Sequence, residues 1–447
     1  MRRTLATILV LTTAGTLRAQ APLTLAEAFR RADSAAYANR IAAGNVGAQS
    51  AEATAALQGI LPTLRAEGGY VRTDNPLAAF GYTLQQRGVT SASFNPQSLN
   101  RPAPVTNWSG GVVAELPLVN VDVWLGRAAA SDAAAAGRAS AGWTRQTIRV
   151  EVTRAYFGAV LAREQVHTIA AAVSAGRAHV HEAESMVANG LATRSDALLA
   201  TVELGRLEAQ LLESRGEAGI ARASLALLLG QPGDTAFALP DSLPTAERIR
   251  SLVSSSGADS AGTRQDVTSA RLGLDAALGD ARRAGAAFLP RLNGFGRYDW
   301  NSAARPFGGT GSYTVGVMAS WSPWAGGSQL ADRRAARSRA DAARARADAA
   351  EAGAALDQGA TRTRLAVAAA QLDIAEASLA QGAEAHRIVA RKYAGGLATI
   401  AELLDAAAIE TRTRLGLSAA RYQTIVAAAA ARQAAGGDLM AITILEH

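Results

Sequence analysis

A repeat with a spacing of 206 residues constrains the fold of this chain more than any other feature of its sequence. The segment Gly190-Leu191-Ala192-Thr193 recurs as Gly396-Leu397-Ala398-Thr399, and each segment interrupts a long alanine-rich helical pattern. From Pro117 in the first copy and Pro323 in the second, the two copies align without an insertion. A glycine followed by leucine and a capping threonine, between two helical patterns, is typical of the turn of a helical hairpin. The sequence therefore predicts two hairpins of equal length.

Heptad patterns fill the arms of both predicted hairpins. Seam residues, apolar except for His386, recur every seven positions in the same register under the 206-residue shift. They are Val152, Ala159, Val166, Val173, Val180 and Val187 in one copy, and Leu365, Leu372, Leu379, His386 and Tyr393 in the other. Sustained heptads favour left-handed coiled-coil packing. An arm of about 65 residues, at about 1.5 Å per residue, is on the order of 100 Å long. Such a length is typical of a spacer rather than of an enzyme core.

Four segments have the two-residue alternation of β-strands, two before each hairpin: 64–73, 107–118, 291–300 and 313–323. In the third, Leu292, Tyr298 and Trp300 alternate with polar residues, which suits a strand between lipid and a water-filled lumen. A soluble sheet over a hydrophobic core remains the alternative. In the second segment one face carries Trp108, Val112, Ala114 and Leu116. Comparison with the fourth segment under the 206-residue shift predicts instead that Val113 and Glu115 lie on that face. We therefore expect a bulge or a register error there.

Other patterns predict the remaining elements. Thr24 and Glu27 form a capping box that starts a helix, which we expect to continue to Leu61 before Pro62. A second helix is expected from about residue 265 to 289, and residues 74–106 are expected to form a loop. We divide the chain into a signal peptide (1–19), a first repeat (20–233), a linker with one short helix (234–262), a second repeat (263–437) and a C-terminal tail (438–447).

The N-terminus and the composition limit the functional classes. Arg2 and Arg3 before an apolar run, followed by small residues, predict a secretory signal peptide cleaved after Ala19, with a membrane anchor as the alternative. Cleavage removes three of the 45 Lys and Arg residues and leaves 42 against 38 Asp and Glu, a net charge of +4. This charge does not indicate nucleic-acid binding. Because the chain has no cysteine, we expect neither disulfides nor thiolate chemistry.

Four strands are too few to close a barrel, since the smallest outer-membrane barrels have about eight. An open sheet edge cannot face lipid, where its unpaired backbone groups would find no partner. If the strands lie in a membrane, several chains must therefore contribute strands to one barrel.

The sequence resembles the TolC family of outer-membrane efflux channels over essentially all of the predicted mature chain. The segments that carry the resemblance are Leu23 to Ala28, Leu61-Pro62, Leu289-Pro290, Pro117-Leu118, Trp321 to Gly327, Gly190 to Leu198, Leu229 to Pro232 and Tyr393 to Ala406. The resemblance implies a homotrimer in the outer membrane, in which three chains of four strands and four long helices make a 12-stranded β-barrel and a 12-helix periplasmic tunnel. It also implies a periplasmic adaptor and an inner-membrane pump of the RND or ABC type as partners.

The same resemblance assigns roles to particular residues. Gly190, Leu191 and Thr193, with Gly396, Leu397 and Thr399, match the tips on which the adaptor docks. Glu402 and Asp405 match acidic residues around the closed end of the tunnel, where three chains would place six carboxylates in a cation-attracting ring. Two solvated charges near a helix start are the alternative for this pair.

Asp196 and Tyr393 match a pair that holds the closed state by a hydrogen bond. An arginine that strengthens this bond in some members is replaced by Ala398. The resemblance thus implies a weaker closed state here, or one held by Arg391 or Arg194.

No arrangement typical of an enzyme is found in the sequence, and we expect no cofactor and no metal. His179 and His181 lie on different faces of a helix, which leaves His179 with Glu182 as the alternative metal pair. His386 occupies a heptad seam position and is expected to pack or to line a ring. The competing functional hypothesis is a secreted coiled-coil scaffold or adhesin without a pore, which accounts for the heptads but not for strands that end in aromatic residues.

Overall fold

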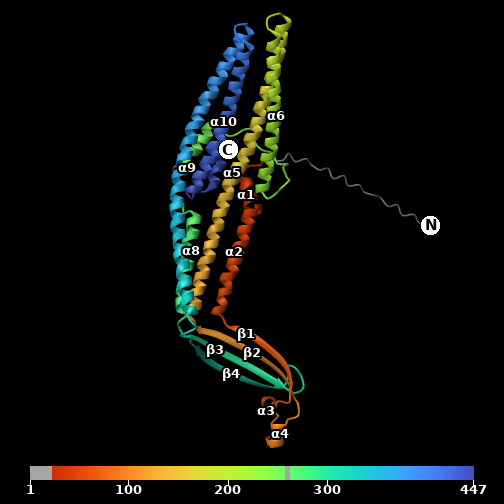
Figure 1. Ribbon diagram of the computed structural model, residues 1–447, viewed down its shortest axis with the longest axis vertical. Coiled ribbons are helices and arrows are strands. Elements are labelled where there is room, and N and C mark those ends of the chain that lie inside the picture. The colour runs from red at the N-terminus through yellow and green to blue at the C-terminus, as the bar shows by residue number, and fades with distance from the viewer. Residues whose placement is uncertain (1–22, 257–261, 447) are drawn as a thin grey trace, which may run out of the picture. The chain divides into compact units, whose positions relative to one another are not determined.

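The computed structural model describes residues 23–256 and 262–446, and the predicted signal peptide lies outside this range. Helices dominate, and one small antiparallel sheet accompanies them, as the sequence predicts (Figure 1). The α-helices are α1 (Leu25–Ala35), α2 (Tyr37–Ala55), α3 (Pro76–Gln85), α4 (Pro96–Asn100), α5 (Val121–Ala188), α6 (Arg194–Leu228), α7 (Ala246–Ser256), α8 (Gln265–Ala286), α9 (Ser328–Ala394) and α10 (Ile400–Ala434). The 3-10 helices are η1 (Ala56–Gly59), η2 (Ser91–Phe94) and η3 (Leu439–Glu446), and the strands are β1 (Thr63–Thr73), β2 (Val105–Val119), β3 (Arg291–Ser302) and β4 (Thr310–Ser320).

The two predicted hairpins are present and match in length. The outgoing helices α5 and α9 have 68 and 67 residues, and the returning helices α6 and α10 have 35 each. The described residues form two units, one drawn from 23–40, 144–256, 262 and 356–446 and the other from 41–143 and 263–355. Each unit therefore takes residues from both sequence repeats. The first contains both hairpin tips, and the second contains the sheet.

The first unit has a hydrophobic core to which the predicted linker and tail contribute. Phe29 of α1 and Tyr156 of α5 are fully buried, and the Tyr156 hydroxyl donates a 2.7 Å hydrogen bond to the Leu23 carbonyl. Ile249 and Leu252 of α7, within the predicted linker, and Leu439, Ile442 and Leu445 of η3, within the predicted tail, join this core. These segments are thus structural parts of the unit rather than loose connections.

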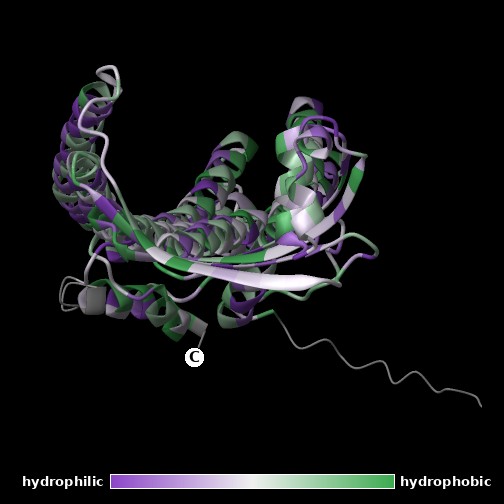
Figure 2. Ribbon diagram, turned by 90° about the horizontal axis from the view of Figure 1, so that it is seen from below, coloured by the Kyte–Doolittle hydropathy of each residue, from purple (hydrophilic) through white to green (hydrophobic). Residues whose placement is uncertain are grey.

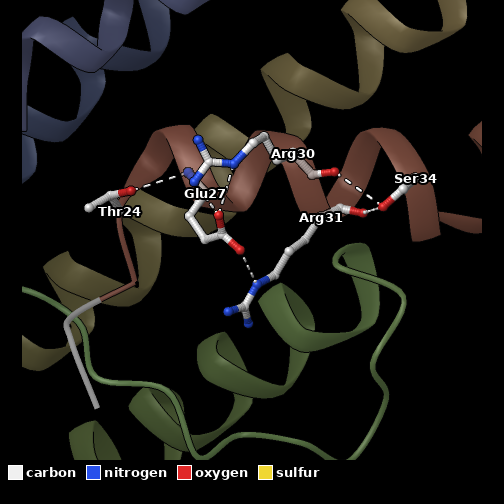
Figure 3. A network of polar contacts seen from close by, with 5 residues as sticks. All are labelled: Thr24, Glu27, Arg30, Arg31 and Ser34. Carbon is white, nitrogen blue, oxygen red and sulfur yellow. Dashed lines mark hydrogen bonds and ion pairs between the residues drawn. The ribbon is translucent and has the colours of Figure 1, made fainter. Parts of the chain in front are cut away.

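The start of α1 follows the predicted cap only in part (Figure 3). The Glu27 amide donates to the Thr24 hydroxyl at 3.2 Å, so the helix begins after Thr24. The Glu27 carboxylate does not return to the Thr24 amide. Instead it accepts hydrogen bonds from Arg31 and Arg30, each at 2.9 Å through Nε. These hydrogen bonds, that from Arg31 first, lower the pKa of Glu27.

The prediction of one helix from residue 25 to 61 is wrong. Ala36 adopts an extended conformation (φ −57°, ψ 133°) and separates α1 from α2, and a 3-10 turn ends α2 before Pro62. The buried Asn39 amide donates to the Ala32 carbonyl at 2.9 Å across this break. Neither proline nor glycine marks the position. The break results from the packing of α1 into the core, which overrides the high helix propensity of alanine.

The sheet has the order β1-β2-β3-β4 with antiparallel neighbours, so β1 and β4 are its open edges (Figure 1). Tyr70 lies opposite Trp108, Val112 opposite Tyr298, and Tyr298 opposite Tyr313. These residues share one face, on which Tyr313, Val315 and Val317 are largely exposed in the single chain. Figure 2 shows hydrophobic and hydrophilic residues mixed along the strands. The register places Leu292, Tyr298 and Trp300 on one face of β3, as their alternation predicts.

The expected irregularity in β2 is a bulge between Pro117 and Val119, where the pairing with β3 shifts by one residue. A one-residue shift exchanges the two faces of a strand. Trp108, Val112, Ala114 and Leu116 consequently share the face of Tyr298, as their own pattern indicates. The 206-residue shift gives the wrong face for Val113 and Glu115, because it does not allow for this bulge.

Residues 74–106 are not the continuous loop that we expected, since α3, η2 and α4 lie within them. The side chain of Asn75 accepts from the Ala78 amide at 3.1 Å, and that of Asn95 accepts from the Gln97 amide at 2.9 Å. Pro76 and Pro96 then occupy the first helical positions, where proline is favoured. Both Asn-Pro pairs are visible in the sequence and are start signals for short helices.

Glycines that end helices provide a matched test of packing in the first unit. Gly230 and Gly190 have nearly equal φ of +72° and +73°, but a Cβ on Gly230 would lie 2.7 Å from the Ala35 carbonyl carbon, whereas one on Gly190 would meet nothing within 4 Å. Both alanine variants carry the cost of a left-handed conformation, about 1–2 kcal/mol. Gly230→Ala adds a backbone clash of about 1–3 kcal/mol.

We therefore expect Gly230→Ala to lower the midpoint of denaturant unfolding, followed by tryptophan fluorescence in detergent, by clearly more than Gly190→Ala does. Equal midpoints for the two variants would contradict the close approach of Gly230 to Ala35.

Candidate functional site

The two hairpin tips have the same backbone structure. At the end of α5 the Leu191 amide donates to the Met186 carbonyl at 2.8 Å and the Gly190 amide to the Val187 carbonyl at 3.0 Å. The second tip repeats both bonds, from Leu397 to Lys392 at 2.8 Å and from Gly396 to Tyr393 at 2.9 Å. This pattern is the Schellman motif, which requires a positive φ at the glycine. It leaves Leu191 and Leu397 about 80% exposed, at 78% and 81%.

Both returning helices begin with a capping box. The Thr193 amide donates to Asp196 Oδ2 at 2.9 Å, and the Thr399 amide donates to Glu402 Oε2 at 2.7 Å. Asp196 and Glu402 are separated by the repeat spacing of 206 residues, so the residue predicted for the latch and one predicted for the acidic ring are equivalent. The hydrogen bond from the threonine amide is the main cause that lowers the pKa of each carboxyl. Each acid thus has a structural role at its own helix start.

The predicted acidic residues Glu402 and Asp405 are both exposed at the start of α10. Asp405 lines a cavity of about 440 Å³ with Arg206 and Arg412. The described structure places the two acids within one helical turn of each other, close to the tip.

The predicted latch residues come close, but they are not hydrogen-bonded to each other in the single chain. Tyr393 is 4% exposed and belongs to a cluster with Ala183, Ala200 and Leu403, which joins helices of both hairpins. Its hydroxyl has no hydrogen-bond partner among the described residues. Burial first, and then the charges of Glu182 and Asp196, raise the pKa of Tyr393.

A larger cavity of about 920 Å³ lies between the hairpins, lined by residues of α5, α6, α9 and α10. His179 and His386 meet there with ring centroids 6.2 Å apart and ring planes at 77°. Nδ1 of His386 lies 2.6 Å from Oε2 of Glu410, which also accepts a 2.7 Å hydrogen bond from Arg414 through Oε1. The sequence did not predict this pair, because His386 stands where the first repeat has Val180 and the 206-residue shift does not align the two histidines.

The polar face of the sheet carries charges that neutralise one another. Arg297 pairs with Asp299 at 2.7 Å and lies 3.7 Å from Glu67, which is also 3.8 Å from Arg65. These side chains lie on the face opposite Tyr298 and Tyr313. The face that a water-filled lumen would need is therefore polar without a strong excess of one charge.

The described residues contain neither a larger metal-ligand cluster nor a helix suited to cross a membrane. Within residues 23–256 and 262–446, no three or more His, Cys, Asp or Glu side chains gather as metal ligands. None of the helices in that range combines the length and apolar character required to cross a membrane.

Comparisons with known proteins agree with this architecture. The family described as outer membrane efflux protein matches residues 40–231 and again residues 259–437. A search of curated proteins finds no match. The outer membrane protein VceC of Vibrio cholerae is 19% identical with a TM-score of 0.75, covering 92% of this chain and 96% of VceC.

Two further solved structures share the fold. A membrane protein from Pseudomonas aeruginosa is 20% identical with a TM-score of 0.77, covering 92% of each chain. The open state of the Neisseria gonorrhoeae MtrE outer membrane channel is 18% identical with a TM-score of 0.72, covering 94% of this chain and 90% of MtrE. None of these matches supports the alternative of a secreted scaffold without a pore.

The capping boxes predict a pH dependence at the tips. A carboxyl with a lowered pKa stabilises the folded state above its unfolded pKa and loses this effect as the pH falls through its folded pKa. Protection of the Thr193 and Thr399 amides against hydrogen exchange, normalised to intrinsic rates, should therefore fall below about pH 4. Asp196→Asn and Glu402→Gln should remove this pH step at their own tip, because the amide side chains do not titrate.

Glu384→Gln is the matched control. Among the described residues the Glu384 carboxylate accepts hydrogen bonds from Arg387 on the same helix, and that hydrogen bond is the main cause that lowers its pKa. A pH step that survives in Asp196→Asn and Glu402→Gln would show that the caps do not cause it.

Proposed function

We propose that this chain, which belongs to the outer membrane efflux protein family and is a protein of the outer membrane, is the exit channel of a tripartite efflux or type I secretion system. In this role it passes substrates from a periplasmic adaptor and an inner-membrane pump of the RND or ABC type to the outside. The observation that carries the proposal is a four-stranded sheet with two open edges and one exposed apolar face, in a chain whose paired helical hairpins end in matching exposed tips.

The sheet supports a barrel that several chains build together. Strands β1 and β4 have 11 residues each, which is enough to cross the hydrocarbon core when tilted. With an even number of antiparallel strands, β4 of one chain can pair antiparallel with β1 of the next. This pairing satisfies the open edges, which lipid cannot do. Three chains give 12 strands, and the number three comes from the resemblance to the TolC family.

The helices of the hairpins also have unpaired apolar faces. Val202, Leu212 and Ile220 of α6 are about 70% exposed, at 70%, 73% and 69%. On α9 Leu356 and Ile374 are similarly exposed, at 72% and 66%. Apolar side chains at helical spacing favour burial against further helices. Neighbouring copies of the same hairpins would cover both faces and close a ring of 12 long helices.

The tips are proposed to serve docking and closure. Leu191 and Leu397, held outward by Gly190 and Gly396, offer apolar contacts to an adaptor. Thr193 and Thr399 fix the start of the returning helices. Glu402 and Asp405 from three chains form the acidic ring, which attracts cations by its charge.

The selectivity of the channel tests this function. Purified protein should run as a heat-sensitive trimer and form cation-selective pores in planar bilayers. Glu402→Gln with Asp405→Asn removes six charges from three chains and should bring the ratio of K⁺ to Cl⁻ permeability towards one. Glu384→Gln, which removes an exposed carboxylate on α9 rather than on α10, should leave the ratio unchanged. A protein that washes off the membrane as a monomer would exclude the channel.

The closed-state latch predicts a second electrical change. Asp196 and Tyr393 are proposed to hold the tips closed, with the Tyr393 hydroxyl, free in the single chain, as the donor. Replacing them together by Ala and Phe should raise the mean single-channel conductance. Phe keeps the ring in its cluster with Ala183 and Leu403, so the change at Tyr393 removes only the hydroxyl. If the closed-state current of this double variant equals that of the wild type, the pair is not a latch.

A further inference from the structure

We infer that His179 and His386 form a two-histidine binding site for a divalent first-row transition metal ion, such as Zn²⁺, Cu²⁺ or Ni²⁺. Helix α5 supplies one imidazole and α9 the other, so the site joins the two hairpins. The two rings lie 6.2 Å apart, centroid to centroid, with their planes at 77°. They line the same cavity of about 920 Å³.

The separation of the rings suits a shared ion. A metal–nitrogen bond of about 2.0–2.1 Å places the ring centres of two histidines on one ion about 5–6 Å apart. The observed distance of 6.2 Å lies just above this range. Small side-chain rotations are therefore enough to bring one nitrogen of each ring to the ion, and α5 and α9 need not move.

The hydrogen bond of His386 prepares it as a ligand. An ionised carboxylate only accepts hydrogen bonds, so at 2.6 Å from Glu410 the Nδ1 atom of His386 carries the proton. In the neutral ring Nε2 then carries the lone pair that can bind a metal ion. A carboxylate behind a histidine in this way fixes the orientation of metal ligands and raises their basicity.

Three imidazole nitrogens at this place are buried and have no hydrogen-bond partner: Nε2 of His386, and Nδ1 and Nε2 of His179. Buried polar atoms are normally hydrogen-bonded, so this concentration needs an explanation. The neutral imidazole is the form that binds a metal ion.

The remaining surroundings indicate an exchangeable site rather than a structural one. Since no third metal ligand is grouped with the pair in the described ranges, water from the cavity fills the other coordination positions. Imidazole nitrogen suits zinc, copper and nickel better than magnesium or calcium. The charged groups beside the pair or lining its cavity are Glu164 and Glu182 on α5, Glu203 on α6, Asp241 between α6 and α7, and Glu410, Arg414 and Arg421 on α10.

Titration of the intact detergent-solubilised protein, purified without a histidine tag, tests the inference. Zn²⁺ binding is measured by competition with a fluorescent chelator, and Cu²⁺ binding by electron paramagnetic resonance. The wild type should bind Zn²⁺ and give a Cu²⁺ signal with two coupled imidazole nitrogens. His179→Ala or His386→Ala should weaken Zn²⁺ binding at least tenfold and leave one coupled nitrogen. Glu410→Gln should weaken it by about 10–100-fold with both nitrogens retained.

His181→Ala is the matched control, because His181 is exposed on α5 two residues beyond His179. This variant should bind as the wild type does, and unfolding curves confirm that each variant is folded. Wild-type affinity in the double variant His179→Ala/His386→Ala would overturn the inference, as would a single coupled nitrogen in the wild type or an equal loss in His181→Ala. The titration does not depend on conductance, so its outcome is separate from that of the proposed channel function.

Discussion

The hydrogen bonding of exposed strand edges is the constraint on which the rest of this structure depends. A sheet with the order β1-β2-β3-β4 leaves the backbone groups of two strands without partners, and lipid offers none. The apolar face around Tyr298 and Tyr313 cannot be covered by the chain's own sheet either. Once chains pool their strands, the helices that continue from the strands are brought together as well. The exposed apolar residues of α6 and α9 are where such neighbours would pack.

Features with a long, repeated signal could be predicted from the sequence, whereas local departures from the repeat could not. The heptads and the two tips predicted the hairpins correctly, because seven-residue periodicity over ten turns is compatible with few structures other than a long helix. The face of Trp108 followed from its own strand pattern, but the bulge at Pro117 was needed to explain why the repeat disagreed. The break at Ala36 left no sign, because packing rather than propensity causes it. The helices after Asn75 and Asn95 do have a signal in the sequence, the Asn-Pro pair, although we expected a loop in this region.

The candidate site shows what duplication conserves and what it does not. The Schellman turn and capping box are the same at both tips, down to the acid three residues after each threonine. These contacts are local and need only a few residues, so the sequence pattern predicts them well. The pairing of His179 with His386 depends instead on which helix faces which across the two hairpins. No sequence offset contains that information, since the residues are not equivalent in the repeat.

The proximity of α5 and α9 also limits the effect that a ligand at the two histidines can have on the conformation of the hairpins. A bound ion changes a conformational equilibrium only by the ratio of its affinities for the two states. Tyr393 lies two helical turns beyond His386 on α9, in a cluster that also contains Ala183 of α5. Any movement that separates α5 from α9 would therefore separate both the imidazoles and this cluster. An ion held by both rings binds only the arrangement in which they are close, so it would favour that arrangement over one with the hairpins apart.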